Sequence, residues 1–223
     1  MQKFCEFFGI GKGISAMIGG GGKTSTMYAL ADYLRTIGSV FVCTSTHIHR
    51  PPQYPFLPFV SEKLNTGEVI SIGTSEGVKL TSPIQSFLEL TQYADFVLVE
   101  ADGSRQFPLK AHASHEPVIP EGTQTVLALI GIDGIGKPIC DVAHRPELFA
   151  SISNASVHDL VTEEMIRSVL ETYPKVDGIV INKADDDCLV HRGLSLAKMF
   201  SVPVAITAWQ TNNPIKAYWR NDR

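Results

Sequence analysis

Short apolar runs rich in β-branched residues alternate along this chain with stretches of helical periodicity. Runs of this kind predict buried strands, and the longer periodic stretches predict helices. Strands that alternate with helices favour parallel pairing through right-handed crossovers. We therefore expect an α/β fold, a three-layer, doubly wound and mostly parallel sheet. The expected strands lie at 14–18, 39–43, 96–99, 125–130, 176–181 and 204–208, and the expected helices at 3–8, 25–37, 84–92 and 162–172.

A run of four glycines separates the first expected strand from the first long helix. Lys23 and Thr24 follow the glycines directly, where that helix begins. Backbone N–H groups at a helix N-terminus bind phosphate, a lysine there contacts the terminal phosphates, and a threonine hydroxyl is a magnesium ligand. The pattern predicts a fold of the P-loop NTPase type that binds a nucleotide and Mg²⁺. Its predicted phosphate-binding residues are Gly19, Gly20, Gly21, Gly22, Lys23, Thr24 and Ser25.

The glycine run departs from the standard P-loop pattern, because Met17 stands where that pattern has its first glycine. It resembles instead the looser loop of metal-chaperone and signal-recognition NTPases, with Ile18 where those proteins often carry a lysine. The alternative interpretation is a flexible glycine-rich turn, or a packing point between strand and helix. A lysine-threonine pair at the start of a helix favours the phosphate-binding interpretation.

A second motif, Asn182-Lys183-Ala184-Asp185, follows the expected strand at 176–181. Asn-Lys-x-Asp after a buried strand is the guanine-reading motif of GTPases. Asp185 is expected to accept hydrogen bonds from the base, Asn182 to hold the loop and touch the base edge, and the Lys183 stem to pack along the ring. Adenine lacks that pair of donors, so the motif predicts GTP in preference to ATP. The alternative is a solvated acidic turn, because two more aspartates follow Asp185.

The expected strand at 96–99 leads into two acids, Glu100 and Asp102, and then Gly103. A central parallel strand delivers such carboxylates to the carboxyl edge of its sheet, where α/β proteins bind ligands. We expect one of the two acids to hold the magnesium water shell or to orient an attacking water, and the sequence leaves open which. The alternative for Asp102 is a turn cap with Gly103. The predicted metal ligands are Thr24, Glu100 and Asp102.

Two polar, proline-rich segments, 105–120 and 131–147, leave the ends of expected central strands, and neither favours a crossover helix. Charged side chains of the first segment are expected to face the nucleotide or a second substrate, where a cation neutralises phosphate charge and a histidine moves a proton. For any one of them, an exposed loop position with an incidental charge is the alternative. These residues are Arg105, Lys110, His112, His115 and Glu116. The predicted catalytic residues are Lys23, Glu100, Asp102, Arg105 and Lys110.

Residues 131–137 resemble a second phosphate loop, but Pro138 stands in place of the hydroxyl residue and no helix is expected to follow. Prolines between positions 51 and 58 predict an exposed loop. Residues 68–80 are expected to form a hairpin that turns between Gly73 and Gly77.

His47 and His49, with Cys43 nearby, admit the interpretation of a metal site, because alternate residues of an extended segment share a face. Two histidines without a third clear ligand are more often ordinary loop residues, so zinc is not expected. Thr44 and Thr46 are better candidates for switch residues that sense magnesium or the last phosphate.

A chain of 223 residues with 44% hydrophobic and 19% charged residues can form one globular domain. We expect a single domain over 1–223 with loop insertions at about 47–80, 103–124 and 131–160. The net charge of −4 argues against a nucleic acid partner. No apolar run reaches membrane-spanning length and no signal pattern opens the chain, so no membrane association is expected. The four scattered cysteines suit a reducing, cytoplasmic location.

Together these motifs resemble those of the YqeC-type family, accessory proteins of selenium-dependent molybdenum hydroxylases. The family tends to show three threonines at 44–46, where this chain has Ser45, and a proline where it has His112. The resemblance implies a part in maturing or inserting a labile selenium-containing cofactor, with the hydroxylase client or its cofactor as partner. It covers nearly the full length and rests on GGGGKT at 19–24, CTSTH at 43–47, VEADGSR at 99–105, PLKAHASHEPVIP at 108–120, HRPELF at 144–149 and NKAD at 182–185.

The leading hypothesis is therefore a Mg²⁺-dependent NTPase that prefers GTP and drives maturation of such a hydroxylase. The second is phosphotransfer to a small molecule, which would bind the loop at 105–116. The third is a nucleotide-sensing adaptor without appreciable catalysis. NTPases of related design often dimerise across the nucleotide, which makes a homodimer a candidate assembly.

Overall fold

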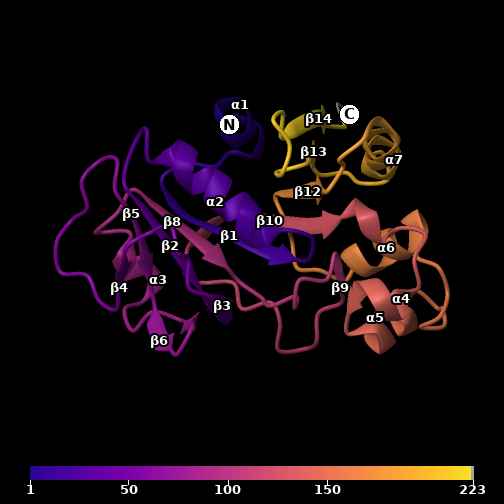
Figure 1. Cartoon of the computed structure of the whole chain (residues 1–223), viewed down its shortest axis with the longest axis horizontal. Helices are drawn as coiled ribbons and strands as arrows, with labels where there is room; N and C mark the ends of the chain where they lie inside the picture. The colour runs from indigo at the N-terminus through magenta and orange to yellow at the C-terminus, as the bar shows by residue number, and fades with distance from the viewer. Residues whose placement is uncertain (222–223) are drawn as a thin grey trace. The chain divides into compact units, whose positions relative to one another are not determined.

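The computed structural model describes residues 1–221, which group into two compact units (Figure 1). The first unit comprises 1–18, 24–103 and 117–126. The second comprises 19–23, 104–116 and the described chain from Leu127 onward. The expectation of a single domain over 1–223 stays a prediction, and each unit is described below by itself.

The first unit is built on parallel strands in the order β1-β8-β2-β5-β4. A separate antiparallel sheet has the order β3-β7-β6. The strands are β1 (Gly13–Gly19, whose last residue belongs to the second unit), β2 (Val40–Thr44), β3 (His47–His49), β4 (Phe56–Leu57), β5 (Val69–Ile72), β6 (Thr74–Glu76), β7 (Lys79–Thr81) and β8 (Phe96–Glu100). The helices are α1 (Gln2–Phe8), α2 (Lys23–Leu34) and α3 (Phe87–Leu90).

The acidic strand β8 lies between β1 and β2, and its register fixes what stands beside its last residue. Glu100 pairs with Met17 on β1 and with Thr44 on β2. Every residue of β8 and of β2 is buried, as expected for central parallel strands. The carboxyl ends of the three strands therefore bring Glu100 level with Thr44, at the edge where ligands bind in α/β folds.

The second unit holds strands in the order β14-β13-β12-β10, of which only β14 runs antiparallel to its neighbour. A further parallel pair joins β9 to β11. The strands are β9 (Leu109–Lys110), β10 (Thr123–Gly131, which begins in the first unit), β11 (Ala143–His144), β12 (Gly178–Asn182), β13 (Val204–Thr207) and β14 (Ile215–Trp219). The helices are η1 (Ile132–Gly134), α4 (Ile139–Val142), α5 (Pro146–Ile152), α6 (Glu163–Leu170) and α7 (Asp187–Ala197).

Both units are α/β with mostly parallel strands, so the predicted fold class is confirmed. Side-chain caps mark several helix starts, as the composition of those sites favours. Ser86 accepts from the Glu89 N–H at α3, and Thr162 accepts from the Met165 N–H at α6. Asp186, from the acidic run after Asn182, accepts from the Leu189 N–H at α7. Within residues 1–221, no helix has both the length and the apolar character needed to cross a membrane.

Some expected boundaries are wrong. The hairpin predicted over 68–80 is confined to β6 and β7, because the buried residues of β5 pair in parallel with β2. The absence of a helix after residue 137 is also wrong, since α4 follows Pro138 and α5 follows in the same segment. The N–H groups of the first helical turn have no acceptor within the helix, so a proline, which has no N–H, fits at a helix start. Pro138 is the N-cap of α4, and Pro146 is the first residue of α5.

Candidate functional site

The four consecutive glycines at 19–22, in the second unit, have no room for side chains. A Cβ placed on Gly20 would lie 2.7 Å from the Pro108 carbonyl oxygen, closer than real Cβ atoms come to backbone. The other three glycines meet obstacles just as near. The loop is therefore fitted against its surroundings, which argues against a merely flexible turn. For Gly19, Gly21 and Gly22 the first atoms met are Leu129 O, Gly131 N and Asn182 Nδ2.

Two backbone hydrogen bonds hold this loop in place. The Gly20 N–H donates to Leu129 O at 2.9 Å, and the Gly21 N–H donates to Phe107 O at 3.1 Å. These two amides therefore have protein acceptors, although we expected them to face phosphate. The N–H groups of the first turn of α2, which includes Thr24 and Ser25, have no acceptor within an α-helix. We therefore expect phosphate contacts from the N–H groups at the start of α2 rather than from those of Gly20 and Gly21.

Lys23 is 2% exposed, and its Nζ donates to Gly19 O at 2.6 Å. The side chain curls back over the loop from which it comes. A buried ammonium keeps its charge only with good acceptors nearby. The Lys23 ammonium, which we expect to bind phosphate, therefore lies against the backbone of the glycine loop.

Asn182 ties the glycine loop to the end of the neighbouring strand. Its Nδ2 donates to Gly21 O at 2.7 Å, and its Oδ1 accepts from Thr207 Oγ1 at 3.1 Å. The amide is 4% exposed and is used at both ends. Asn182 therefore holds the glycine loop in place, and its contact with a base stays a prediction.

The two charged residues of the Asn-Lys-x-Asp motif are more exposed than Asn182, whereas Ala184 between them is buried. Lys183 has a positive φ of 65°, which is uncommon outside glycine. Its Nζ lies 3.1 Å from Asp133 Oδ2, and the pair is partly exposed. Asp185 is exposed, so its carboxylate is accessible to a ligand. The roles of Lys183 and Asp185 at a guanine base stay predictions.

In the first unit, Glu100 lies beside the start of α2. Thr24 Oγ1 donates to Glu100 Oε2 at 2.7 Å. Thr44 Oγ1 donates to the Glu100 carbonyl oxygen, also at 2.7 Å. Burial and the nearby Glu100 charge raise the pKa of Tyr28 to about 12. Glu100 is thus in contact with Thr24, and Asp102 is fully buried two positions later.

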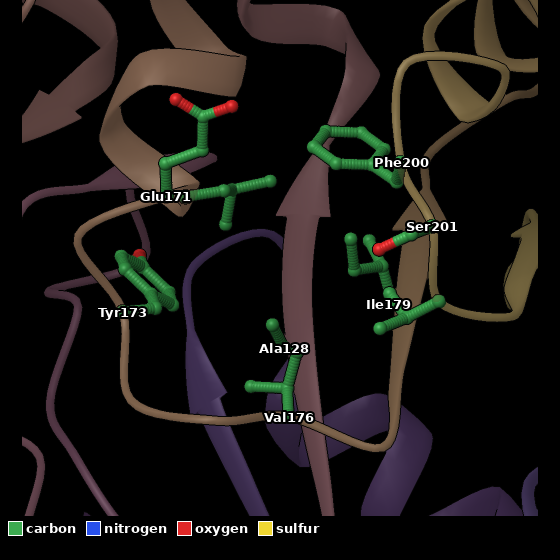
Figure 2. Close-up of a pocket in the computed structure, with 9 residues that line it drawn as sticks. Ala128, Glu171, Tyr173, Val176, Ile179, Phe200 and Ser201 are labelled. Carbon is green, nitrogen blue, oxygen red and sulfur yellow. The ribbon is translucent and has the colours of Figure 1, made fainter.

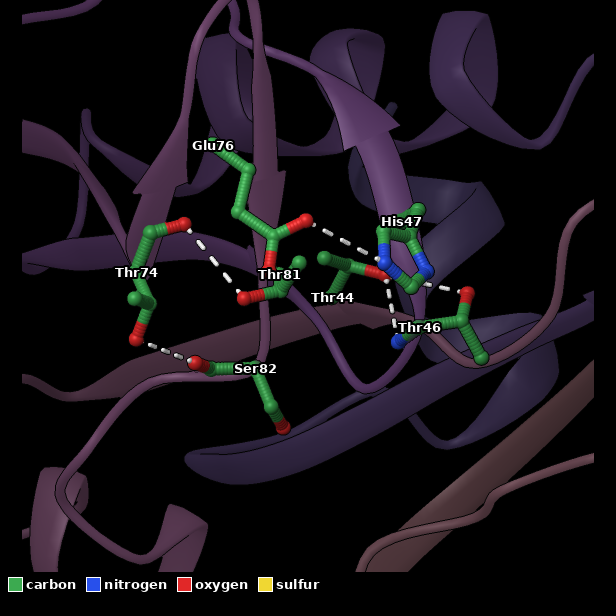
Figure 3. A network of polar contacts seen from close by, with 7 residues as sticks. All are labelled: Thr44, Thr46, His47, Thr74, Glu76, Thr81 and Ser82. Carbon is green, nitrogen blue, oxygen red and sulfur yellow. Dashed lines mark hydrogen bonds and ion pairs between the residues drawn. The ribbon is translucent and has the colours of Figure 1, made fainter.

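Beyond Thr44, the chain forms a polar network with the β6–β7 hairpin (Figure 3). The Thr46 N–H donates to Thr44 Oγ1 at 3.0 Å. His47 Nε2 lies 3.6 Å from Glu76 Oε2, with both side chains more than half exposed. Thr44 and Thr46 are therefore in mutual contact, and their role as switch residues stays a prediction.

The candidate zinc ligands divide between core and surface. The Cys43 thiol is buried and donates to Leu98 O, and burial raises its pKa well above its usual range. His47 and His49 are both exposed on β3, on the shared face that alternation predicts. The buried thiol and the two exposed imidazoles do not form one donor set.

The charged loop after residue 104 is partly interior. Lys110 is 1% exposed, and its Nζ lies 3.2 Å from Glu116 Oε2. The His112 ring packs on Tyr173 with 4.0 Å between centroids. Arg105 and His115 are exposed. The structure therefore brings Lys110 and Glu116 together but not in solvent, and the predicted contacts of this loop with a substrate stay predictions.

Sequence reasoning missed two neighbours of this pair. Arg145 Nη2 lies 2.8 Å from Glu116 Oε2, and His144 precedes it on β11, which pairs with β9. The HRPELF segment was a family marker without a role. Two basic residues directly before a proline, in a segment that leaves the end of an expected central strand, were the available signal.

An apolar pocket also lies in the second unit, beside the starts of β12 and β13 (Figure 2). The glycine loop instead packs on Gly131, the last residue of β10. The pocket has few polar groups, so it has no evident part in phosphate chemistry. Its lining includes Ala128, Tyr173, Val176, Ile179 and Phe200.

Comparison with known proteins adds the family. A family model described as YqeC protein matches residues 15–147. That range contains the glycine loop and the acidic strand and ends before Asn182. A protein of Escherichia coli (strain K12), named uncharacterized protein YqeC, is 32% identical over 162 residues, which is 63% of this chain. The match spans 60% of that relative's length.

Proposed function

Because the chain belongs to the YqeC family, we propose that it binds and hydrolyses a nucleoside triphosphate with Mg²⁺, preferring GTP. As the family resemblance implies, it then acts as an accessory factor in selenium cofactor biosynthesis or in maturation of selenium-dependent molybdenum hydroxylases. The observation that carries the nucleotide part is the 2.7 Å hydrogen bond from Thr24 Oγ1 to Glu100 Oε2. It joins a hydroxyl at a glycine-loop helix to an acid at a strand end.

This pair fits a magnesium ion. Hydroxyl and carboxylate oxygens are the hard donors that Mg²⁺ prefers, and the ion usually takes few protein ligands and completes its shell with phosphate and water oxygens. Among residues 1–221, no group of three or more histidine, cysteine, aspartate or glutamate side chains forms a metal site. When bound, Mg²⁺ would neutralise charge on the transferring phosphoryl group.

Lys23 supplies the second charge. Its ammonium now donates to Gly19 O, and a phosphate oxygen would be a stronger, charged acceptor for the same donor. The fitted glycines leave the backbone free to approach that phosphate closely.

GTP preference rests on the motif at 182–185. Asn182 fixes the loop through Gly21 O, which leaves the exposed Asp185 as the group that would read the base. A carboxylate that pairs with a guanine N1–H and amine would lose both bonds to adenine.

Asp102 is buried two residues after Glu100, the last residue of β8, and is proposed to orient the attacking water.

The test is nucleotide binding and turnover by the full chain. GTP and ATP are titrated with and without Mg²⁺, and released phosphate is measured, for the parent and for Lys23→Ala. We expect Lys23→Ala to abolish turnover, whereas Lys3→Ala, an exposed lysine on α1, serves as matched control. Turnover by Lys23→Ala at the parental rate would contradict the assignment of the glycine loop.

The base preference has its own test. Asp185→Ala should bring GTP affinity down to that for ATP, with ATP affinity unchanged. The matched control is Asp187→Ala, an exposed neighbour in α7. If the parent binds ATP as well as GTP, the guanine part fails while the hydrolysis part stands.

Phosphotransfer to a small molecule is a second candidate, favoured by one observation. The segment that accepts the Gly21 N–H at Phe107 O continues directly into the buried Lys110. Product analysis separates the two functions, because free phosphate without a phosphorylated acceptor excludes a kinase.

A further inference from the structure

The apolar pocket of the second unit has room for one small ring. Its volume is about 140 Å³. Protein interiors are close-packed and leave few voids larger than a water molecule, so a space of this size beside a buried sheet is uncommon. An apolar cavity of about 150 Å³ binds one benzene molecule, whereas pockets for drug-sized ligands are about 300–1,000 Å³. The size therefore fits a single aromatic ring and excludes a nucleotide.

The inner lining of the pocket is apolar and comes from the sheet. Ala128 on β10 and Ile179 on β12 are register partners on neighbouring strands, and both are buried. Val176 and Phe200 add apolar surface from the segments that lead into β12 and β13 (Figure 2). Moving an apolar ring from water onto such a lining is favourable, whereas a charged group placed there would lose its hydration. The lining therefore favours an uncharged ligand with an apolar body.

Tyr173, one wall of the pocket, is fixed by contacts outside it. The Tyr173 hydroxyl donates to Lys110 O at 2.8 Å, and its ring packs on the His112 ring with 4.0 Å between centroids. These two contacts hold the ring in one orientation before a ligand arrives. A preformed wall lowers the entropy that binding costs. An aromatic ligand would also gain from edge-to-face packing against Tyr173 and Phe200.

The rim of the pocket is polar. Glu171 and Ser201 are exposed, and the Ser201 hydroxyl points toward the other lining side chains (Figure 2). The Glu171 carboxylate points away from Ala128 and Val176, and its Oε1 accepts from Arg167 Nε at 2.8 Å. Because Arg167 compensates the Glu171 charge, the rim does not call for a charged ligand. A hydroxyl group on the ring would instead find a hydrogen-bond partner in Ser201 Oγ.

The apolar pocket and the glycine loop lie near different ends of β12. Ile179 is the second residue of that strand, whereas Asn182, which donates to Gly21 O, is its last. Parallel α/β folds bind their substrates at the carboxyl ends of the strands. A molecule in the apolar pocket would therefore not compete with a ligand at the glycine loop.

We propose that the apolar pocket is a binding site for a small uncharged molecule with one aromatic ring and a hydroxyl substituent. The ring lies between Tyr173 and Phe200 and covers Ala128 and Ile179, and the hydroxyl meets Ser201 at the rim. This site goes beyond the proposed function, because its lining residues belong neither to the glycine loop nor to the motif at 182–185.

The test follows binding of 4-fluorophenol to the full chain by fluorine NMR. Ser201→Trp should weaken binding at least tenfold, because the indole would fill the pocket from an exposed position. Ser151→Trp, at an exposed position on α5 that does not line the pocket, is the matched control and should leave the affinity unchanged. Ser201→Ala should weaken 4-fluorophenol binding several-fold and leave the affinity for fluorobenzene, which has no hydroxyl, unchanged.

A second measurement places the probe in the parent chain without any substitution. At saturation, nuclear Overhauser contacts should join the ring protons of 4-fluorophenol to the methyl groups of Val176 and Ile179. Their absence at saturation overturns the proposal, and so does equal affinity in Ser201→Trp and the parent. Tighter binding of 4-fluorobenzoate than of 4-fluorophenol overturns the uncharged ligand class. Displacement of the probe by GTP would show that the pocket belongs to the nucleotide site, which also overturns the proposal.

Discussion

The side-chain amide of Asn182 donates to Gly21 O at 2.7 Å, so the end of β12 and the glycine loop are held as one piece. Gly21 contributes only a carbonyl oxygen, and Asn182 is anchored in turn by the Thr207 hydroxyl. The loop conformation in the second unit thus depends on a residue far away in sequence. Four predictions follow from this and related contacts.

Asn182→Ala should both destabilise the protein and weaken nucleotide binding. The change leaves the Gly21 carbonyl and the Thr207 hydroxyl without their partner, at a cost of about 1–3 kcal/mol in the free energy of unfolding. Affinity for GTP and ATP should fall by the same factor, because the loop and not the base is affected. Denaturant unfolding and nucleotide titration measure the two effects. A loss confined to GTP would show instead that Asn182 acts through the base.

Gly20→Ala should disrupt the loop although glycine-to-alanine changes are often harmless. The new methyl group would lie 2.7 Å from Pro108 O, and relieving that contact means moving backbone. We expect a loss of about 1–3 kcal/mol in unfolding free energy and no measurable nucleotide binding. Gly11→Ala is the matched control, since nothing lies within 4 Å of its added Cβ. Equal behaviour of the two variants would contradict the fitted-loop description.

Glu100→Gln should remove the magnesium dependence of nucleotide binding. The amide can keep a hydrogen bond to Thr24 Oγ1 but loses the charge that a hard cation requires. Affinity should then be the same with Mg²⁺ as with a chelator, whereas the parent gains affinity with Mg²⁺. Glu62→Gln, exposed in the first unit, is the control. If Asp102→Asn loses the dependence and Glu100→Gln keeps it, Asp102 is the magnesium acid.

His144 should make the protein less stable in mild acid. Its folded pKa is about 4 because of burial and nearby cations, against 6.5 for an unperturbed histidine. As pH falls from about 6.5 to about 4, His144 binds a proton in the unfolded chain but not in the folded chain, so the unfolding free energy falls. Above that window the contribution is fully present. Urea unfolding at pH 7.5 and pH 5.0 should show a smaller drop for His144→Gln than for the parent.

Local pattern was enough to place six strands and the glycine loop; these strands are β1, β2, β8, β10, β12 and β13. The apolar runs that became β8, β10 and β12 are buried on both faces, which makes them legible in a sequence without partners. The order Gly-Lys-Thr after such a run likewise placed α2 correctly. Thr24 and Glu100 were both predicted as metal ligands, and they are in contact.

Long-range pairing was beyond the reach of the sequence. The segment that forms β5 is a short apolar run before a glycine. A parallel partner of β2 and the first arm of a hairpin would both have this pattern, so no local feature tells them apart. Lys110 was expected to face the nucleotide or a second substrate from a loop. It is instead buried against Glu116, which also contacts Arg145 from a different segment. The choice between Glu100 and Asp102 also needed the neighbouring helix, since both acids follow the same strand.

Because Glu100 contacts Thr24, the number of residues in β8 decides which side chain faces Thr24. Successive strand residues point to opposite sides of a sheet, so one residue added to or removed from β8 would turn the glutamate away and present an alanine or a valine. Changes of length at the exposed Pro52 and Gln53 have no such effect, since neither residue lies in a strand. Homologous chains should therefore vary freely in length there, yet keep an invariant number of residues from Phe96 to Glu100.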